Sequence, residues 1–221
     1  DLLPLEQGSW LVLASCDYML SDAAKGYDIR KFLIDNGFPF SHNHYRYIPH
    51  KMMAAMSAWD KLNTEGEITV AQLGDLYNYL GKTYVKRGFI TKVLNEENKS
   101  QTVNKEQIIN MYGLKEECLD EEWKEVFSKT IDVKRRAFIE KALANGEDLF
   151  GEPRIAISTI HQAKGGEAEN VAVLLDLLPA QQQDFILKPD GLHRQFYVAV
   201  TRALQNLYLV KAKSENYRYL I

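Results

Sequence analysis

Four short, largely apolar runs constrain the fold of this chain more than any other feature of its sequence. They lie at Trp10–Ala14, 155–158, 171–175 and 207–210. Such runs are typical of strands that are covered on both faces, as in parallel sheets flanked by helices. One run lies near the start of the chain and three lie in its last third. The sequence therefore predicts one parallel α/β sheet that is assembled from both ends of the chain.

The stretch from 63 to 151 has a different character, because helical patterns dominate it and strand-like runs are scarce. A turn-rich break at 63–67 opens it. We expect helices at 70–80, Lys105–Tyr112, 121–129 and Val133–Ala144. No internal repeat and no low-complexity tract is found. The predicted organisation is an α/β domain at 1–62 and 152–221, interrupted by a mostly helical insertion at 63–151.

Three further helices are expected within the α/β segments. The first starts at Asp22 as its cap and ends before Gly37, in the usual position of a C-terminal glycine. The second begins with Pro49 in its first turn and runs to Leu62. The third covers 193–204. Helices of this kind would cover the sheet.

Composition limits the classes of function. The formal net charge of −3 gives no global attraction to nucleic acid, so DNA binding would need a local surface. No apolar run approaches the roughly 18 residues of a membrane span, and no leader pattern opens the chain, so we expect no membrane partner. Cys16 and Cys118 fit neither a disulfide framework nor metal-ligand spacing, which favours reduced thiols in the cytoplasm. The start at Asp1, without a methionine, is interpreted as a fragment boundary.

The first motif with chemistry lies at 158–167 and reads Ser-Thr-Ile-His-Gln-Ala-Lys-Gly-Gly-Glu. It directly follows a predicted strand, and ligands of open parallel sheets gather at the carboxyl ends of strands. Thr159, His161 and Lys164 can donate hydrogen bonds to phosphate oxygens there, and the two glycines allow a close backbone approach. Taken alone, the motif could equally be a polar loop with a glycine turn.

The second motif, at 193–203, reads His-Arg-Gln-Phe-Tyr-Val-Ala-Val-Thr-Arg-Ala. At helical spacing its apolar residues can face inward while Arg194 and Arg202 project elsewhere. Arginine suits bidentate contact with phosphate. Alone, it could be an amphipathic helix with surface arginines.

Together, and in this order between strands, the two motifs resemble motifs V and VI of UvrD/Rep-type superfamily 1 DNA helicases. The glycine–aromatic–proline–aromatic turn at 37–40 resembles that family's motif IV region, and 63–151 occupies the place of its inserted subdomain. The resemblance implies a second RecA-like domain, that is, a P-loop NTPase-like parallel sheet that lacks the P-loop. The sequence departs from the family at Gly166 and Ala168, and it has Tyr27 near the place of a motif IV arginine.

The resemblance also implies roles for individual residues. Arg202 would be the catalytic arginine that reaches the γ-phosphate of ATP during phosphoryl transfer. Further contacts with ATP are implied for Glu167, Arg194 and Gly165. Contacts with single-stranded DNA are implied for Thr159, His161 and Lys164.

The function implied is that of the C-terminal motor domain of an ATP-dependent DNA helicase or translocase in a bacterial or phage-infected cell. No Gly-x-x-x-x-Gly-Lys-Ser/Thr loop occurs in the chain. ATP and Mg²⁺ would therefore be held mainly by an N-terminal RecA-like domain of the same polypeptide, and this chain alone would not hydrolyse ATP. The alternative is a decayed helicase half that binds DNA or a partner without catalysis.

Two clusters lie outside the motifs. His42, His44 and His50 have no cysteine or carboxylate among them at ligand spacing, so we expect no metal site there. The basic run at 134–136 reads as a solvated helix face, with phosphate contact as the alternative.

Overall fold

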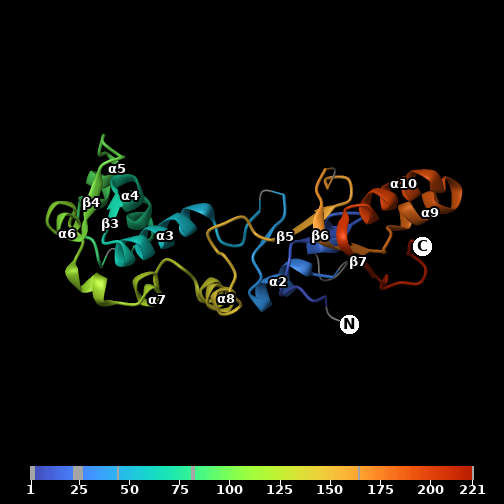
Figure 1. The fold of residues 1–221 in the computed structure, drawn as a ribbon, viewed down its shortest axis with the longest axis horizontal. Coiled ribbons are helices and arrows are strands. Elements are labelled where there is room, and N and C mark those ends of the chain that lie inside the picture. Colours follow the sequence, from blue (N-terminus) through green and yellow to red (C-terminus); the bar gives the residue numbers. More distant parts are fainter. Residues whose placement is uncertain (1–2, 22–26, 44, 81–82, 164, 221) are drawn as a thin grey trace. The chain divides into compact units, whose positions relative to one another are not determined.

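The computed structural model describes residues 3–21, 27–43, 45–80, 83–163 and 165–220. The chain forms two compact units (Figure 1). Unit 1 comprises 1–46, 141–148 and 152–221, and unit 2 comprises 47–140 and 149–151. Unit 1 is therefore built from segments at both ends of the sequence, as the apolar runs predict.

A five-stranded parallel sheet organises unit 1. Its strands are β1 (Trp10–Ala14), β2 (Phe40–Ser41), β5 (Ile155–Thr159), β6 (Ala168–Leu174) and β7 (Ala203–Val210). They are arranged in the order β2-β5-β1-β6-β7, and every neighbouring pair is parallel. All four apolar runs are strands of this sheet, so the predicted parallel α/β class is confirmed.

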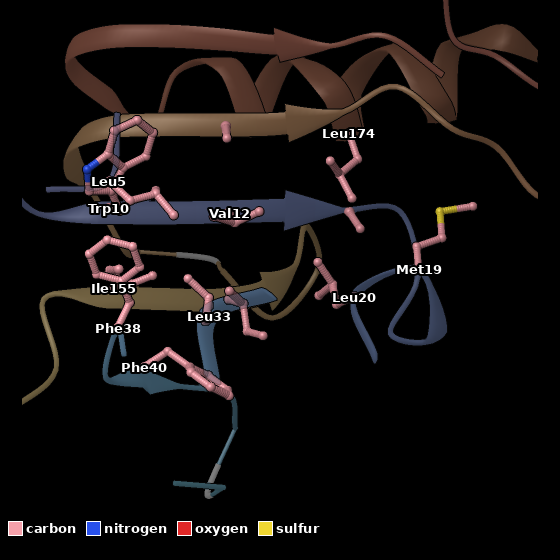
Figure 2. Close-up of a cluster of buried hydrophobic side chains, with 13 residues drawn as sticks. Leu5, Trp10, Val12, Met19, Leu20, Leu33, Phe38, Phe40, Ile155 and Leu174 are labelled. Carbon is pink, nitrogen blue, oxygen red and sulfur yellow. The ribbon is translucent and has the colours of Figure 1, made fainter. Parts of the chain in front are cut away.

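Apolar side chains cover both faces of this sheet. Unit 1 contains the helices α1 (Tyr18–Ser21), α2 (Ile29–Asn36), α9 (Pro179–Leu187) and α10 (Pro189–Val200). On one face, Trp10, Val12 and Ile155 form a cluster with Leu33 of α2 (Figure 2). On the other face, Leu13 and Val173 lie in a cluster with Phe196 of α10. Each such buried side chain contributes about 1.5–3 kcal/mol, so the residues of β1, which alternate between the two clusters, stabilise both faces of the sheet.

The first helix begins later than the sequence predicts. Asp22 lies outside the described residues, and α2 begins at Ile29 with Asp28 as its cap. The side chain of Asp28 accepts a hydrogen bond from the backbone N–H of Lys31. Gly37 ends the helix as predicted, with φ of 74°. A Cβ at Gly37 would lie 2.5 Å from that of Lys141, so glycine is required there by both conformation and space.

The predicted helix at 193–204 is wrong at both ends. It begins earlier, at Pro189, and it stops at Val200. Thr201 and Arg202 form a turn, and β7 begins directly after them at Ala203. Leu204, which is apolar, belongs to β7. Apolar residues on both sides of the turn hid the change from helix to strand.

Unit 2 is mainly helical, with one small antiparallel sheet. Its elements are α3 (His50–Thr64), β3 (Glu67–Thr69), α4 (Val70–Tyr79), α5 (Phe89–Leu94), β4 (Thr102–Asn104), α6 (Lys105–Tyr112), η1 (Glu116–Asp120), α7 (Trp123–Val126) and the first part of α8 (Val133–Ala144). The helix expected at 121–129 is reduced to the short α7. In place of the expected division at 62, unit 2 begins at 47, because Trp59 and Leu62 of α3 are buried and the Trp59 ring contacts Phe127 edge-on.

Both cysteines are free thiols, and burial raises the pKa of the Cys118 thiol to about 12. In the part of the chain that the structure describes, no helix is both long and apolar enough to cross a membrane.

Candidate functional site

Thr159 is the last residue of β5, and a tight turn follows it. The backbone carbonyl of Thr159 accepts hydrogen bonds from the backbone N–H groups of Gln162 and Ala163, at 3.1 and 3.0 Å. The Thr159 hydroxyl lies 3.1 Å from the side-chain oxygen of Gln162. Ile160 and Ala163 are buried and anchor the turn to the sheet, while His161 between them is exposed. The turn thus presents the side chain of His161 to solvent, two residues after Thr159.

The glycines of the first motif do not line a tight space. Gly165 has φ of 87°, and no atom lies within 4 Å of a Cβ built on it. The left-handed backbone, rather than crowding, is therefore what requires glycine at this position. Lys164, immediately before it, lies outside the described residues.

Arg202 and Glu167 come together at the start of β6 and β7. The Nη1 atom of Arg202 lies 3.9 Å from Oε1 of Glu167. The Nε–H of Arg202 donates to the backbone carbonyl of Val198 at 3.0 Å, which fixes the guanidinium against the end of α10. The backbone carbonyl of Arg202 also accepts from the N–H of Ala168 at 3.2 Å. The turn after α10 is thereby tied to the end of the first motif.

The two halves of the first motif lie at opposite edges of the sheet. Thr159 is level with Ala14, at the carboxyl ends of β5 and β1, whereas Ala168 is level with Ala203, at the amino ends of β6 and β7. Six residue steps along β6 correspond to about 20 Å. The sequence places the whole motif at the carboxyl edge, but the structure places only its first part there. The segment 160–167 crosses from one edge to the other because β5 and β6 run in the same direction.

Arg194 is not brought to the Arg202–Glu167 pair. It is exposed on α10, eight residues before Arg202, which is about 12 Å along a helix axis. It instead borders an apolar groove of about 420 Å³. The other lining residues are His193, Phe196, Tyr197, Val200 and Tyr219. Within the groove the rings of Phe196 and Tyr219 stack, with centroids 3.9 Å apart.

One polar cluster at the carboxyl edge was not anticipated from the sequence. The side chain of His42, just after β2, is fully buried. Its Nδ1 accepts from Nε of Arg30 at 2.7 Å, and its Nε2 lies 2.7 Å from Oδ1 of Asp17. Burial, and then the nearby charge of Arg30, lower the pKa of His42. Asp17, Arg30 and His42 lie apart in the sequence and form no motif, so the sequence gives no signal for such a cluster.

The histidines at 42, 44 and 50 and the basic run at 134–136 lie outside the two motifs. His44 lies outside the described residues, and His50 is exposed at the start of α3. Among the described residues, no group of three histidine, cysteine or acidic side chains could hold a metal ion. In the basic run, Arg135 pairs at 2.7 Å with Asp132, the residue immediately before α8.

Comparison with known proteins places the chain in a family. The family described as UvrD-like helicase C-terminal domain matches residues 33–214. This range includes β2, β5, β6, β7 and both motifs. No curated protein matches the chain.

Proposed function

The chain belongs to the UvrD-like helicase C-terminal domain family, and from this we propose that it is the second motor domain of an ATP-dependent DNA helicase or translocase. The parallel sheet is consistent with the RecA-like fold of that family. In this proposal the chain supplies an arginine to the ATP site and part of the track for single-stranded DNA. The other partner is an N-terminal RecA-like domain of the same polypeptide.

The observation that carries the proposal is the pairing of Arg202 with Glu167. The side chain of Arg202 is 20% exposed and that of Glu167 is 53% exposed. Ion pairs this open to water contribute at most about 1 kcal/mol. A phosphate group can therefore replace the carboxylate of Glu167 at little cost in free energy. The hydrogen bond to the carbonyl of Val198 keeps the guanidinium of Arg202 in place during this exchange.

The residues of this chain fit the triphosphate end of a nucleotide. Bound ATP, with its Mg²⁺, supplies the phosphoanhydride bond whose hydrolysis drives movement. Arg202 donates from its two terminal nitrogens to γ-phosphate oxygens and stabilises the charge that develops there. The exposed carboxylate of Glu167 accepts a hydrogen bond from a ribose hydroxyl. Gly165 shapes the loop beside it, and Arg194 supports the phosphate end only if α10 shifts toward it. We assign no Mg²⁺ ligand to the described residues.

The DNA track lies at the carboxyl edge of the sheet in this proposal. Thr159, exposed His161 and Lys164 donate to backbone phosphates of single-stranded DNA. The segment 160–167 joins this edge to the Arg202–Glu167 pair, so a shift of Glu167 on nucleotide binding is transmitted along a short stretch of chain. Buried Ile160 and Ala163 hold its first half to the sheet.

The test is substitution of Arg202 in the complete enzyme. Arg202→Ala should lower kcat for ATP by at least roughly a hundredfold, because arginines of this kind contribute about 10³–10⁵ in rate. ATP affinity should change far less, since the contact strengthens in the transition state. Arg202→Lys should restore little, because an ammonium lacks the planar fork of a guanidinium. Steady-state hydrolysis and nucleotide binding are measured on the same folded preparation.

Arg218→Ala is the matched control, because Arg218 is also a partly exposed arginine of unit 1 that pairs with a glutamate, Glu215. It should leave kcat within about twofold. If Arg202→Ala keeps normal kcat, Arg202 is a structural residue. If the intact polypeptide binds single-stranded DNA but hydrolyses no ATP, the chain is instead a non-catalytic helicase half that serves as a binding module.

A further inference from the structure

Unit 2 contains the same local structure twice, although the sequence shows no obvious repeat. Thr69 caps α4 and Asn104 caps α6, each by accepting a hydrogen bond from the backbone of a glutamine three residues later. These glutamines, Gln72 and Gln107, each bond back to the backbone N–H of the cap residue. In both copies the capping residue is also the last residue of a three-residue strand.

The two copies are related to each other by reciprocal contacts. β3 pairs with β4 in antiparallel orientation. The backbone N–H of Val70 donates to the carbonyl of Gln101 at 2.9 Å, and that of Lys105 donates to the carbonyl of Gly66 at 3.2 Å. Val70 and Lys105 are equivalent positions in the two copies, and so are Gly66 and Gln101. Each copy therefore holds the first turn of the other copy's helix, as in a local twofold arrangement.

Two helix–loop–helix units joined by a short antiparallel ladder are the arrangement of calcium-binding hands, in which a 12-residue loop surrounds the ion. In the second copy this loop corresponds to 96–107. The side chains at its first, third, fifth, ninth and twelfth positions are Glu96, Asn98, Ser100, Asn104 and Gln107. In the first copy α3 continues to Thr64, so a comparable open loop does not form.

These side chains do not fit a calcium ion. The last position of a calcium loop is normally a bidentate glutamate and the sixth a glycine, but here they are Gln107 and Gln101. The side-chain oxygen of Gln107 already accepts from the backbone of Asn104 at 3.0 Å. A neutral amide with its oxygen occupied is a poor substitute for two carboxylate oxygens.

The ammonium of Lys99 closes the loop in a different way. Its Nζ donates to the backbone carbonyls of Val93 and Leu94, at 2.8 and 2.7 Å, at the end of α5. The backbone carbonyl of Lys99 accepts in turn from the N–H of Ala71 at 3.0 Å. A positive charge is thus fixed at the carboxyl end of a helix, where it is electrostatically favourable. Lys99 connects the loop to both copies, through its ammonium to α5 and through its backbone carbonyl to α4.

Apolar side chains from the segment after α6 pack against the two helix–loop–helix copies. Cys118, Val126, Phe127 and Ile131, from the segment after α6, are all buried at 0–1% exposure. The Phe127 ring contacts Trp59 of α3 with centroids 6.3 Å apart. This burial stabilises the pair without a contribution from a metal ion.

We propose that 50–112 is a paired helix–loop–helix of the calcium-hand type that closes without a metal ion. The ammonium of Lys99 closes the second loop from outside the ligand positions, by donating to the backbone carbonyls of Val93 and Leu94 at the end of α5. A divalent cation is consequently not needed to hold this pair of helix–loop–helix units closed.

The test restores a cation loop in the full chain. The variant Lys99→Gly, Ser100→Asp, Gln101→Gly, Gln107→Glu removes the ammonium and supplies two carboxylates and the loop glycine. It should bind one Ca²⁺ with a Kd of about 10⁻⁵–10⁻³ M by isothermal titration calorimetry, and Ca²⁺ should raise its Tm. The unsubstituted chain should show no saturable Ca²⁺ binding and the same Tm in CaCl₂ and in EDTA. The matched control keeps Gln107 and carries the other three substitutions, and it should bind Ca²⁺ at least about tenfold more weakly.

A folded variant that binds no Ca²⁺ would overturn the assignment of the loop, and Ca²⁺ binding by the unsubstituted chain would overturn its metal independence. A second substitution covers the case in which the quadruple variant does not fold. Lys99→Met should lower the Tm by at least about 3 °C, whereas Lys51→Met, at an exposed position of α3, should leave it unchanged. Equal Tm values for these two variants would also reject the role of Lys99.

Discussion

At the scale of single residues, the sequence indicates which residues form the candidate site better than it indicates where they lie in the fold. The arginine and the glutamate of the two motifs can be selected from the pattern, and Gly37 can be placed as a helix terminator from its usual role. Arg202 lies in a turn beside Glu167 because α10 ends at Val200 and β7 begins at Ala203. Tertiary pairing with β6 decides that boundary, so local propensity does not reveal it.

His42 gives a prediction about pH. Burial and the neighbouring Arg30 lower the pKa of His42 in the folded protein below its usual value near 6.5. The unfolded chain therefore takes up a proton at a higher pH than the folded chain, so the free energy of unfolding should fall as pH drops below about 6.5. Urea unfolding at pH 7.5 and at pH 5.5 measures this loss.

The His42→Asn variant should lose less stability between these two pH values, because its side chain does not titrate. His161→Asn serves as the control, since His161 is exposed, and it should keep the loss of the unsubstituted chain. An equal loss in His42→Asn would show that another group causes the acid sensitivity.

At the scale of elements, several helices and the apolar strands are predictable. The helices α6 and α8 agree with their predicted bounds, and for α6 the cap Asn104 and the terminating Gly113 define both ends locally. The repeat in unit 2 is not visible in the sequence, since its copies share little more than an apolar residue, a cap and a glutamine. The capping box is the signal that could have revealed it, because it occurs at Thr69 and again at Asn104.

The segment 160–167 gives a prediction at this scale. Gly165→Ala forces alanine into a left-handed conformation, which costs about 1–2 kcal/mol. The substitution should shift the segment that connects the two edges of the sheet. In the complete enzyme it should reduce the stimulation of ATP hydrolysis by single-stranded DNA several-fold, as measured by steady-state rates with and without DNA.

Gly66→Ala is a close control, because Gly66 has φ of 82° and equally open surroundings, but lies in unit 2. It should cost similar stability in urea unfolding and leave the stimulation by DNA intact. Equal effects of the two variants on stimulation would mean that strain alone, and not the position in the segment, is responsible.

At the scale of the whole molecule, the discontinuous unit 1 is predictable from the distribution of apolar runs, whereas the division itself is not. The sequence favours a boundary at 62 because a turn-rich stretch follows it. The structure assigns 47–140 to unit 2, because α3 buries its apolar face on α4. Burial against a partner element outweighs the local turn signal.

Replacement of 47–140 by a short Gly/Ser linker tests the independence of unit 1. The sheet and both of its apolar clusters lie in the remaining segments, so the variant should unfold in a single cooperative transition. Circular dichroism with urea measures it. A variant with the linker in place of 63–151 keeps α3 and also loses 141–148 of unit 1. It should unfold less cooperatively, because it exposes the apolar face of α3 and removes part of unit 1.

The pairing of β1 with β5 also has a consequence for synthesis on the ribosome. Trp10 is hydrogen-bonded in register with Ile155, yet the chain between them must be made first. At about 5–20 residues per second this takes roughly 7–30 s. Unit 2 relies on local contacts and can fold during that time, while the apolar strand β1 remains without neighbours on either side. The nascent chain is therefore most prone to aggregation before β5 and β6 emerge, and binding of β1 by a chaperone during this interval should increase the yield of folded protein.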